Sequence, residues 1–518
     1  MHGRLSMWRV GFIAAVVFMS GCAQLPTDYE RVESSMLTDT EATQLGQAAP
    51  MLASGESGMR PLPNGVDALV TRIVLAEAAE RSLDVQYYIW HDDLTGRLFA
   101  HALLRAADRG VRVRILLDDV GARANDDNLL SLDLHPNIEI RLFNPVASRS
   151  LRGLGMLSDL ERLNRRMHNK AYIADNQRAV VGGRNIGDEY FEAAGDVAFG
   201  DLDLVTVGPV VVEISKAFDS YWNAPMSLPI GVLTGRQGTV LKLDTLRADL
   251  AEFAEAQRGS PYGRGARTAL VKGLATASEG FFRGKAHVLV DDPEKVSRTK
   301  EDKQGHLLPQ FSTLNLQMRT ELLIISPYFI PGDVGVAWLS GLVRSGLRVV
   351  VLTNSLASSD VSAVHAGYKR YREALLEAGV ELYEFKPEAI EFARSRRSNS
   401  QIGSSRASLH AKTFVFDRRA VFVGSLNLDP RSIQLNTEIG VVCESEPLAS
   451  RLANNVTGAL DKVAWRLERV LEPDGSARIV WIETTDKGTL RLPDEPGVSV
   501  WRQIGVWFMG LLPIESQL

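Results

Sequence analysis

The sequence reads HNKAYIADNQRAVVGGRN over residues 168–185 and HAKTFVFDRRAVFVGSLN over residues 410–427. Both stretches fit the pattern H-x-K-x4-D-x6-G-[GS]-x-N with identical spacing. Each predicts a hairpin whose apolar strand starts at the histidine, turns at the aspartate and returns to the asparagine. Two matches of such a pattern in one chain are much stronger evidence than a single short motif. We therefore expect two copies of one structural unit.

The same order of elements precedes each motif: a strand, a helical stretch and a second strand. Leu83 lies 85 residues before His168, and Leu323 lies 87 residues before His410, so the repeat covers a whole lobe. Strand, helix and strand in this order predict a βαβ unit. We predict an α/β fold with two duplicated lobes, each a mixed, largely parallel sheet flanked by helices, that share one active site at their interface. The segments span residues 83–89, 96–110 and 111–117, and then 322–328, 334–346 and 347–352.

Each motif offers an imidazole, an ammonium group and a carboxamide to one ligand, because side chains alternate along a strand. Phosphodiester transfer uses such a set: fixed donors stabilise the phosphoryl oxygens, one group attacks phosphorus, and another protonates the leaving alkoxide. A lysine beside each histidine repels a metal cation, so we expect neither a metal nor a cofactor. The predicted catalytic residues are His168, Lys170, Asn185, His410, Lys412 and Asn427.

Carboxylates near the motifs receive two different predictions. Asp175 and Asp417 lie at the far turns of the hairpins, away from the histidines, so we expect structural roles for them. Glu438 follows His410 by 28 residues and Asp203 follows His168 by 35 residues. Glu438 can hold the His410 imidazole in the correct tautomer, and Asp203 can do the same for His168, although Asp201 competes with Asp203 for this role.

Four further residues are predicted to bind substrate. Gln86 and Tyr88 in the first copy align with Ser326 and Tyr328 in the second. Each pair shares a strand face near the carboxyl end of the strand, where open α/β sheets bind ligands. These side chains are therefore expected to line a headgroup pocket.

The chain of 518 residues has ordinary globular composition, with 45% hydrophobic and 23% charged residues and a net charge of −5. Without a basic excess, nucleic acid is not an expected partner.

A short apolar run that ends in Ser20-Gly21-Cys22 resembles a bacterial lipoprotein signal, with Cys22 as the lipidated residue. This predicts a lipid-anchored protein of the cell envelope that faces the periplasm, with the outer membrane favoured. The expected parts are a signal peptide (1–22), a flexible tether (23–60), a first lobe (61–225), a mostly helical connection (226–315) and a second lobe with an apolar tail (316–518).

The motifs, with the runs at residues 183–191 and 424–432 and the closing residues 512–515, resemble the phospholipase D superfamily, and within it the bacterial cardiolipin synthases of the C type. The resemblance covers nearly the whole mature chain. It implies that His168 forms a phosphohistidine with a phosphatidyl group while His410 acts as acid and then as base. The serine that the family places after the glycine is Ser425 in the second copy but Gly183 in the first, which removes a hydroxyl donor and suggests that the halves differ in role.

The resemblance implies transfer of a phosphatidyl group between membrane phospholipids, which would be substrates and also the anchoring surface. Three alternatives remain at this point: hydrolysis to phosphatidic acid, a secreted nuclease, and a catalytically silent lipoprotein. The silent protein is disfavoured because both histidines and both lysines are present, and the nuclease because acids and bases nearly balance.

The aromatic tail at residues 501–512 suits either a membrane interface or a helix packed on the core.

Overall fold

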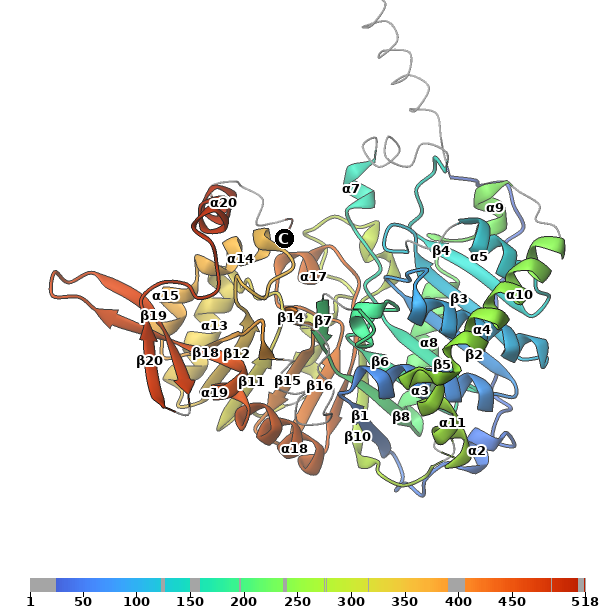
Figure 1. Ribbon diagram of the computed structural model, residues 1–518, viewed down its shortest axis with the longest axis horizontal. Coiled ribbons are helices and arrows are strands. Elements are labelled where there is room, and N and C mark those ends of the chain that lie inside the picture. The colour runs from blue at the N-terminus through green and yellow to red at the C-terminus, as the bar shows by residue number, and fades with distance from the viewer. Residues whose placement is uncertain are drawn as a thin grey trace, which may run out of the picture.

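The computed structural model describes residues 25–122, 126–149, 159–194, 197–235, 240–273, 275, 277–314, 316–389, 406–485, 487–510 and 517. Two lobes lie side by side in Figure 1, the first in blue to green and the second in yellow to red. An 18-stranded sheet runs through both. The predicted α/β architecture of two repeated lobes is confirmed.

Strands of the first lobe lie in one continuous order across the sheet. They are β1 (Ser57–Leu62), β2 (Ser82–Tyr87), β3 (Arg112–Asp118), β4 (Ile138–Phe143), β5 (Ala171–Ala174), β6 (Arg178–Gly182), β8 (Asp203–Val207) and β9 (Ser227–Pro229). Their order is β9-β4-β3-β2-β5-β6-β8-β1. Parallel pairing is confined to β2, β3 and β4, and the motif hairpin β5–β6 is antiparallel.

The second lobe repeats this order around its own motif. Its strands are β10 (Phe282–Val290), β11 (Glu321–Ile325), β12 (Arg348–Asn354), β13 (Glu381–Phe385), β15 (Lys412–Phe416), β16 (Ala420–Gly424), β17 (Ile439–Glu444), β18 (Ala464–Leu471), β19 (Ala477–Thr485) and β20 (Gly488–Leu492). The strand order β13-β12-β11-β15-β16-β17 repeats the order β4-β3-β2-β5-β6-β8 of the first lobe. Because β10 pairs with both β1 and β17, it joins the two lobes into one sheet.

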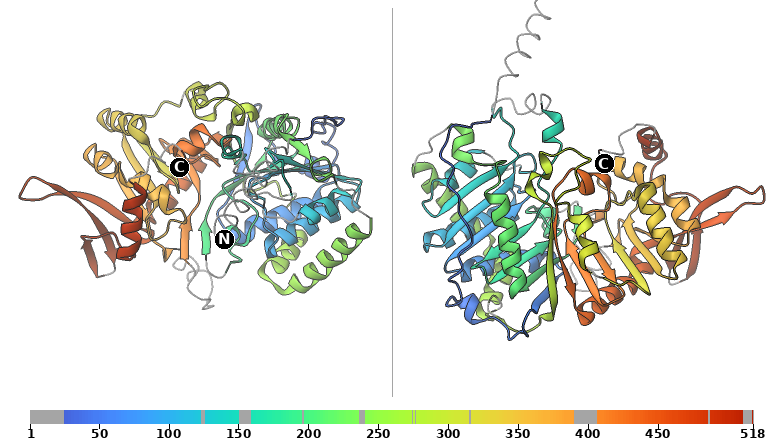
Figure 2. Two further views of the ribbon diagram at one scale, coloured as in Figure 1. Left: turned by 90° about the horizontal axis from the view of Figure 1, so that it is seen from above. Right: turned by 180° about the vertical axis from the view of Figure 1, so that it is seen from behind.

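Helices cover both faces of the sheet. In the first lobe α3 and α4 pack on one face, and α10 and α11 from the connecting segment form an outer layer over them (Figure 2). On the opposite face, α8 and α18 contribute to one hydrophobic core that spans both lobes. The longer helices are α3 (Gly65–Ala78), α4 (Leu94–Asp108), α5 (Asp126–Asp133), α8 (Pro209–Trp222), α10 (Val240–Ala256), α11 (Pro261–Val271), α13 (Gly332–Arg344), α14 (Ser362–Lys369), α18 (Glu446–Thr457) and α20 (Val500–Gly510). The shorter ones include α2 (Gln44–Gln47), α7 (Leu160–Leu163), α9 (Ile230–Thr234), α12 (Leu307–Gln310), α15 (Arg372–Glu377), α17 (Pro430–Gln434) and α19 (Leu460–Val463).

The segment before the first lobe differs from the predicted flexible tether. Leu25 and Tyr29 pack against the core of the first lobe that contains α3 and α4. Residues 34–36 lie against α8: the Met36 amide donates to Asp219, and the Trp222 indole donates to Ser34 Oγ at 2.9 Å. Arg114 also donates to the Ser34 carbonyl. A tether is therefore the wrong description of residues 25–60, because polar groups of the first lobe need these backbone partners.

No helix among the described residues is long and apolar enough to cross a bilayer. The predicted lipidation site, Cys22, lies outside the described residues.

Candidate active site

Each motif is connected to the opposite lobe by backbone hydrogen bonds. The His168 amide donates to the Thr437 carbonyl at 2.9 Å, and the His410 amide donates to the Gly200 carbonyl at 2.8 Å. The second connection continues a parallel pair between β7 (Val197–Gly200) and β14 (Arg406–Leu409). Both histidines are therefore held at the boundary between the lobes, where they form one site.

His168 is oriented by a carboxylate from the second lobe. Its Nδ1 lies 2.8 Å from Glu438 Oε2, and Ser425 Oγ donates to the same oxygen at 2.5 Å. Both the imidazole and the carboxylate are buried. The sequence placed Glu438 with His410, and that assignment is wrong: because residues 436–438 run beside residues 166–168, the carboxylate faces the other histidine.

His410 is oriented by a carboxylate from the first lobe. Its Nδ1 lies 2.6 Å from Asp201 Oδ2. The expectation that Asp203 fills the supporting role is wrong, because Asp203 opens β8 and pairs with Arg72 of α3 at 2.9 Å. Asp201 directly follows β7, the strand that pairs with the segment leading into His410.

Burial and charge set the two halves apart electrostatically. Burial raises the pKa of Glu438 to about 7, although the nearby Lys170 ammonium opposes the rise. Burial is also the largest influence on Asp201, but His410 and Lys412 outweigh it and lower the pKa of Asp201 to about 2. Burial and the positive groups around it hold the pKa of His168 well below its ordinary value, so this imidazole is neutral.

The two motif lysines are buried beside their histidines. Lys170 Nζ donates to the His168 carbonyl at 2.5 Å, and Lys412 Nζ donates to the His410 carbonyl at 2.5 Å. Burial lowers the pKa of Lys170 to about 7 and that of Lys412 to about 8, despite the attraction of nearby carboxylates. An anionic phosphodiester would favour both charged forms, because an opposite charge raises the pKa of an amine.

The motif asparagines close the site from the ends of the return strands. Asn185 accepts from the Ile89 amide at 3.1 Å and donates to the Tyr190 hydroxyl at 3.0 Å. Asn427 donates to Ser432 Oγ at 3.3 Å, and its buried Oδ1 has no hydrogen-bond partner among the described residues. Each carboxamide carries two hydrogens, so one N–H of each can point to a ligand.

Gly183 replaces the motif serine for a steric reason. A Cβ at Gly183 would lie 2.1 Å from Asp201 Oδ1, far inside contact distance. In the other half, the Ser425 side chain fits because Glu438 approaches it as a hydrogen-bond acceptor. The departure from the family pattern therefore makes room for the carboxylate that orients His410.

Both motif aspartates lie at the turns opposite the histidines. Asp175 accepts from the amides of Glu80, Arg81 and Ser82 at 2.8–2.9 Å. Asp417 accepts from the equivalent amides of residues 319–321 at 2.7–2.9 Å. The two aspartates occupy left-handed backbone positions, with φ of 52° and 51°. Each fastens its hairpin turn to the start of the neighbouring strand, β2 or β11, which pairs antiparallel with the first strand of the hairpin.

The predicted substrate residues occupy different places. Tyr88 packs edge-on against the His168 ring at 5.2 Å between ring centres. Gln86 and Ser326 are fully buried and cannot line an open pocket: Gln86 packs against Met167, and Ser326 bonds the backbone of Tyr328.

Tyr328, the fourth predicted substrate residue, donates its hydroxyl to Asp360 at 2.7 Å. Sequence reasoning missed the rings that enclose the second histidine. Tyr190 lies edge-on to His410 at 5.1 Å, and Phe199 stacks on it at 5.0 Å.

Two polar residues at strand ends were also missed. Asp118, the last residue of β3, pairs with Arg166 at 2.8 Å and accepts from the Met167 amide. Asn354, the last residue of β12, accepts from the Leu409 amide at 2.9 Å. Each fixes the residue before a motif histidine. A polar side chain at the carboxyl end of an apolar parallel strand was the available signal.

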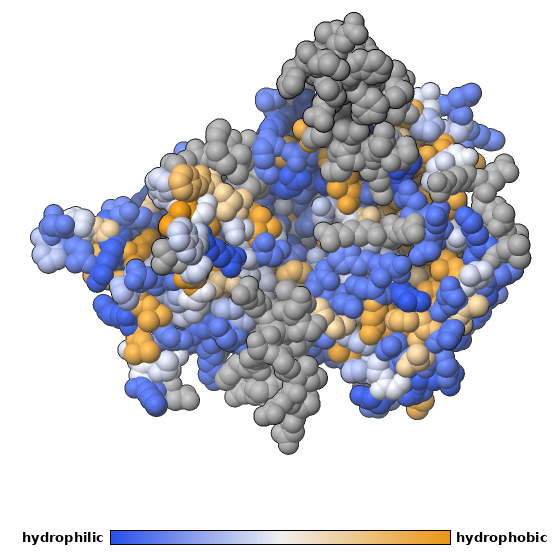
Figure 3. All heavy atoms as spheres, turned by 45° about the horizontal axis from the view of Figure 1, so that its top comes forward, coloured by the Kyte–Doolittle hydropathy of each residue, from blue (hydrophilic) through white to orange (hydrophobic). Residues whose placement is uncertain are grey.

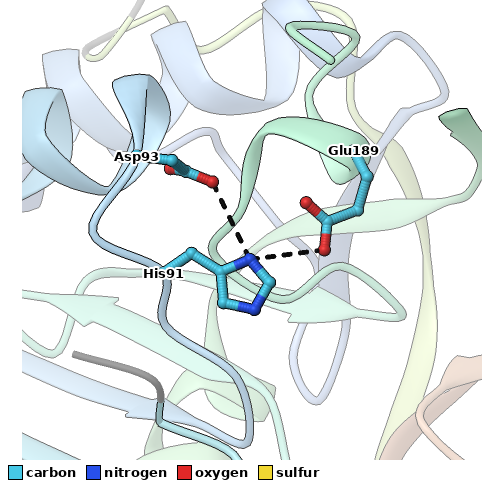
Figure 4. Close-up of side chains that lie close together, drawn as sticks. All are labelled: His91, Asp93 and Glu189. Atoms are coloured by element: carbon cyan, nitrogen blue, oxygen red, sulfur yellow. Dashed lines mark ion pairs between the residues drawn. The ribbon is translucent and has the colours of Figure 1, made fainter. Parts of the chain in front are cut away.

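One group with metal-ligand spacing occurs among the described residues. His91 Nδ1 lies 3.5 Å from Glu189 Oε1 and 3.8 Å from Asp93 Oδ2 (Figure 4). Asp93 already accepts from the Gly96 amide at the start of α4 and from the Asp188 amide. We therefore assign this cluster to holding the loop after β2 against the turn that follows the first motif.

Comparisons with known proteins agree with this geometry. Residues 73–222 and 315–458 match the family model described as "Cardiolipin synthase, PLD-like domain". Cardiolipin synthase C of Escherichia coli (strain K12) is 44% identical over 89% of this chain and 96% of its own length. Cardiolipin synthase B of the same strain is 24% identical over 77% of this chain and 79% of its own length. The crystal structure of phosphatidylserine synthase from Haemophilus influenzae Rd KW20 has a TM-score of 0.53 at 15% identity, covering 82% of this chain and 92% of that one, which shows a shared fold.

Proposed function

Because the chain belongs to the cardiolipin synthase family with PLD-like domains, we propose that it is a phosphatidyltransferase that joins two membrane phospholipids into cardiolipin. One observation carries the proposal: two buried imidazoles share one site, and each is hydrogen-bonded at Nδ1 to a carboxylate of the opposite lobe. A carboxylate at Nδ1 fixes the tautomer, so the chemistry falls to Nε2 of each ring.

In the first step, His168 Nε2 attacks the phosphorus of a donor phospholipid. The bond from phosphorus to the headgroup oxygen breaks, and the protonated His410 gives its proton to the departing alkoxide. In the second step, neutral His410 accepts the proton of an acceptor hydroxyl, whose oxygen attacks phosphorus and breaks the phosphorus–nitrogen bond. Lys170 and Lys412 stabilise the charge on the phosphoryl oxygens, the role that a metal ion fills in other enzymes.

The electrostatics support this division of roles. His168 has the more strongly lowered pKa of the two histidines, so it is the neutral nucleophile. Burial and Lys412 lower the pKa of His410 as well. Asp201, which stays ionised because its pKa is about 2, opposes this lowering and favours the imidazolium that an acid requires.

We further propose that the protein works at a membrane surface of the cell envelope, facing the periplasm. On α20, Trp501 and Trp507 are 82% and 62% exposed, whereas Val506 is buried against Leu356. Figure 3 shows scattered hydrophobic patches on both lobes. Exposed tryptophans on a short helix favour a membrane interface over core packing. A lipid on Cys22 would add the second anchor that stable attachment requires.

The test is lipid analysis of a purified system. The protein is incubated with vesicles of phosphatidylglycerol, alone and mixed with phosphatidylethanolamine, and the extracted lipids are separated and identified by mass spectrometry. Cardiolipin should accumulate with the wild type and not with the His168→Ala variant. Phosphatidic acid without cardiolipin would identify a hydrolase and overturn the proposal.

A further inference from the structure

The two lobes differ in what covers the face of the sheet that carries the motif lysines. In the first lobe this face is covered by α3, a helix of 14 residues, and the Tyr172 hydroxyl of β5 donates to the Arg72 carbonyl of that helix. In the second lobe the described chain between β10 and β11 forms three short helices in place of one long one: η3 (Pro293–Val296), α12 and η4 (Phe311–Leu314), each of four residues. Beside α12 and η4, which line it in part, lies a groove of about 1200 Å³.

Most residues that line this groove are apolar, although Lys303, Asp333 and Gln434 also line it. Phe414 and Phe416 of β15 lie at its floor together with β11 and are largely buried, and α13 forms one side. Val334 and Trp338 on α13 line the groove and are 85% and 49% exposed. The largest exposed apolar patch on a monomeric protein is often functional.

The groove lies beside the second motif, because residues that closely follow Lys412 and Asn427 in the chain line it. Lys412 is the first residue of β15, and Phe414 and Phe416 follow it on the same face because side chains alternate. At about 3.3 Å per residue, the apolar floor begins about 7 Å along the strand from the lysine. At the same end, Leu428 lines the groove directly after Asn427. A ligand with its phosphate at the motifs can therefore extend an apolar portion along this floor.

We propose that the groove holds an acyl chain of the phospholipid whose phosphate reacts at His168 and His410. This inference rests on the proposed function and adds a substrate-binding subsite to it. An acyl chain is apolar, flexible and long, which matches a mostly apolar groove beside the second motif with exposed Val334 and Trp338 at its side. Because α3 covers this face of the sheet in the first lobe, the subsite belongs to the second lobe alone.

A chain-length series tests the subsite. Leu316 lies at the end of the groove beside the Asp417 turn, far from the histidines, and Ile433 lies at the end beside Asn427. Leu316→Trp should lower kcat/KM about tenfold or more for dipalmitoyl phosphatidylglycerol and change it less than about twofold for the dihexanoyl lipid, since steric rejection in an apolar pocket discriminates by roughly 10- to 200-fold. Ile433→Trp, closer to the reaction, should lower kcat/KM for both lipids.

The matched control is Leu490→Trp on β20, where the leucine is 52% exposed and lies outside the groove; it should leave both values unchanged. An unchanged chain-length profile in Leu316→Trp would overturn the proposal, and so would an equal loss for both lipids.

A second measurement needs neither variants nor turnover. Wild-type protein is photolabelled with a phospholipid that carries a diazirine at the end of one acyl chain, and the labelled peptides are mapped. Label on the peptides that contain Met318 or Trp338 is expected. Label confined to α20, or to the segment before residue 25, would show that the acyl chain binds elsewhere. Groove labelling without product refutes the proposed function alone, whereas cardiolipin formation without groove labelling refutes the subsite alone.

Discussion

The two halves of the site carry the same motif but hold their histidines with different carboxylates. His168 faces Glu438, which accepts a hydrogen bond from the Ser425 hydroxyl and has a pKa of about 7. His410 faces Asp201, whose pKa is about 2. Matching motifs thus give one imidazole whose carboxylate partner titrates near neutral pH and one whose partner is ionised throughout that range. A duplicated motif acquires two roles through residues that lie outside it.

The largest expected effect comes from removing either histidine. His168→Ala and His410→Ala should each abolish turnover of natural phospholipids, and the double variant should lose no more than either single one, because the two groups act as a unit. Cardiolipin formation per minute in vesicles is the measurement. Losses that multiply would show that the histidines act independently.

The same variants separate the roles of the halves. A phosphodiester with a very good leaving group needs little acid assistance, so His410→Ala should still form the phosphohistidine while His168→Ala should not. The enzyme is incubated with such a radiolabelled analogue, quenched, digested and sequenced. Label on the peptide that contains His410, or equal label on both peptides, would reverse the assignment or make the halves equivalent.

The next effect comes from the carboxylates that face the histidines. Glu438→Gln and Asp201→Asn keep the size of each side chain and remove its charge. Each should lower kcat by about 10²- to 10⁴-fold, because an amide supports the wrong tautomer. Asp203→Asn, which alters the Arg72 pair, serves as the control with no specific effect on the imidazoles. Losses that were confined to KM would contradict a role in holding the rings.

The pH profile sharpens the contrast between these two carboxylates. Glu438 must be ionised to hold the Nδ1 hydrogen of His168, so kcat/KM should fall as pH drops through about 7. Asp201 is ionised throughout that range and should contribute no limb there. The acid limb should persist in Asp201→Asn and disappear in Glu438→Gln. A limb that both variants retain would assign it to another group.

A smaller effect is expected from exchanging the residues after the motif glycines. Gly183→Ser brings a side chain against the Asp201 carboxylate and should displace it from His410, with a loss of about 10- to 100-fold in kcat. Ser425→Gly removes only one hydrogen bond to Glu438 and should cost less. Initial rates with saturating lipid decide the order. A Gly183→Ser enzyme of normal activity would mean that the clash relaxes without moving Asp201.

The smallest effects concern stability at the two hairpin turns. Asp175 is fully buried, so Asp175→Ala leaves buried amides without an acceptor and should cost roughly 2–4 kcal/mol. Asp417 is partly exposed, water can replace it, and Asp417→Ala should cost about 1 kcal/mol or less. The midpoints of thermal unfolding give the comparison. An equal decrease in both variants would remove this difference between the lobes.

The duplication, the two motifs and their turns could be predicted from the amino-acid sequence, because each motif is a local hairpin whose spacing states its geometry. Because side chains alternate along a strand, the motif histidine and lysine lie on one face. The aspartate at the turn needs only amides of nearby residues as hydrogen-bond donors. The placement of the apolar runs was also sufficient to predict two α/β lobes, since strand and helix periods are local.

Which carboxylate faces which histidine depends on contacts between the two lobes. The pairs His168–Glu438 and His410–Asp201 are separated by 270 and 209 residues, and each joins the two lobes. Proximity along the chain therefore pointed to the wrong partners. The amino-acid sequence also did not predict the groove of the second lobe, because a groove depends on how completely helices cover a face of the sheet.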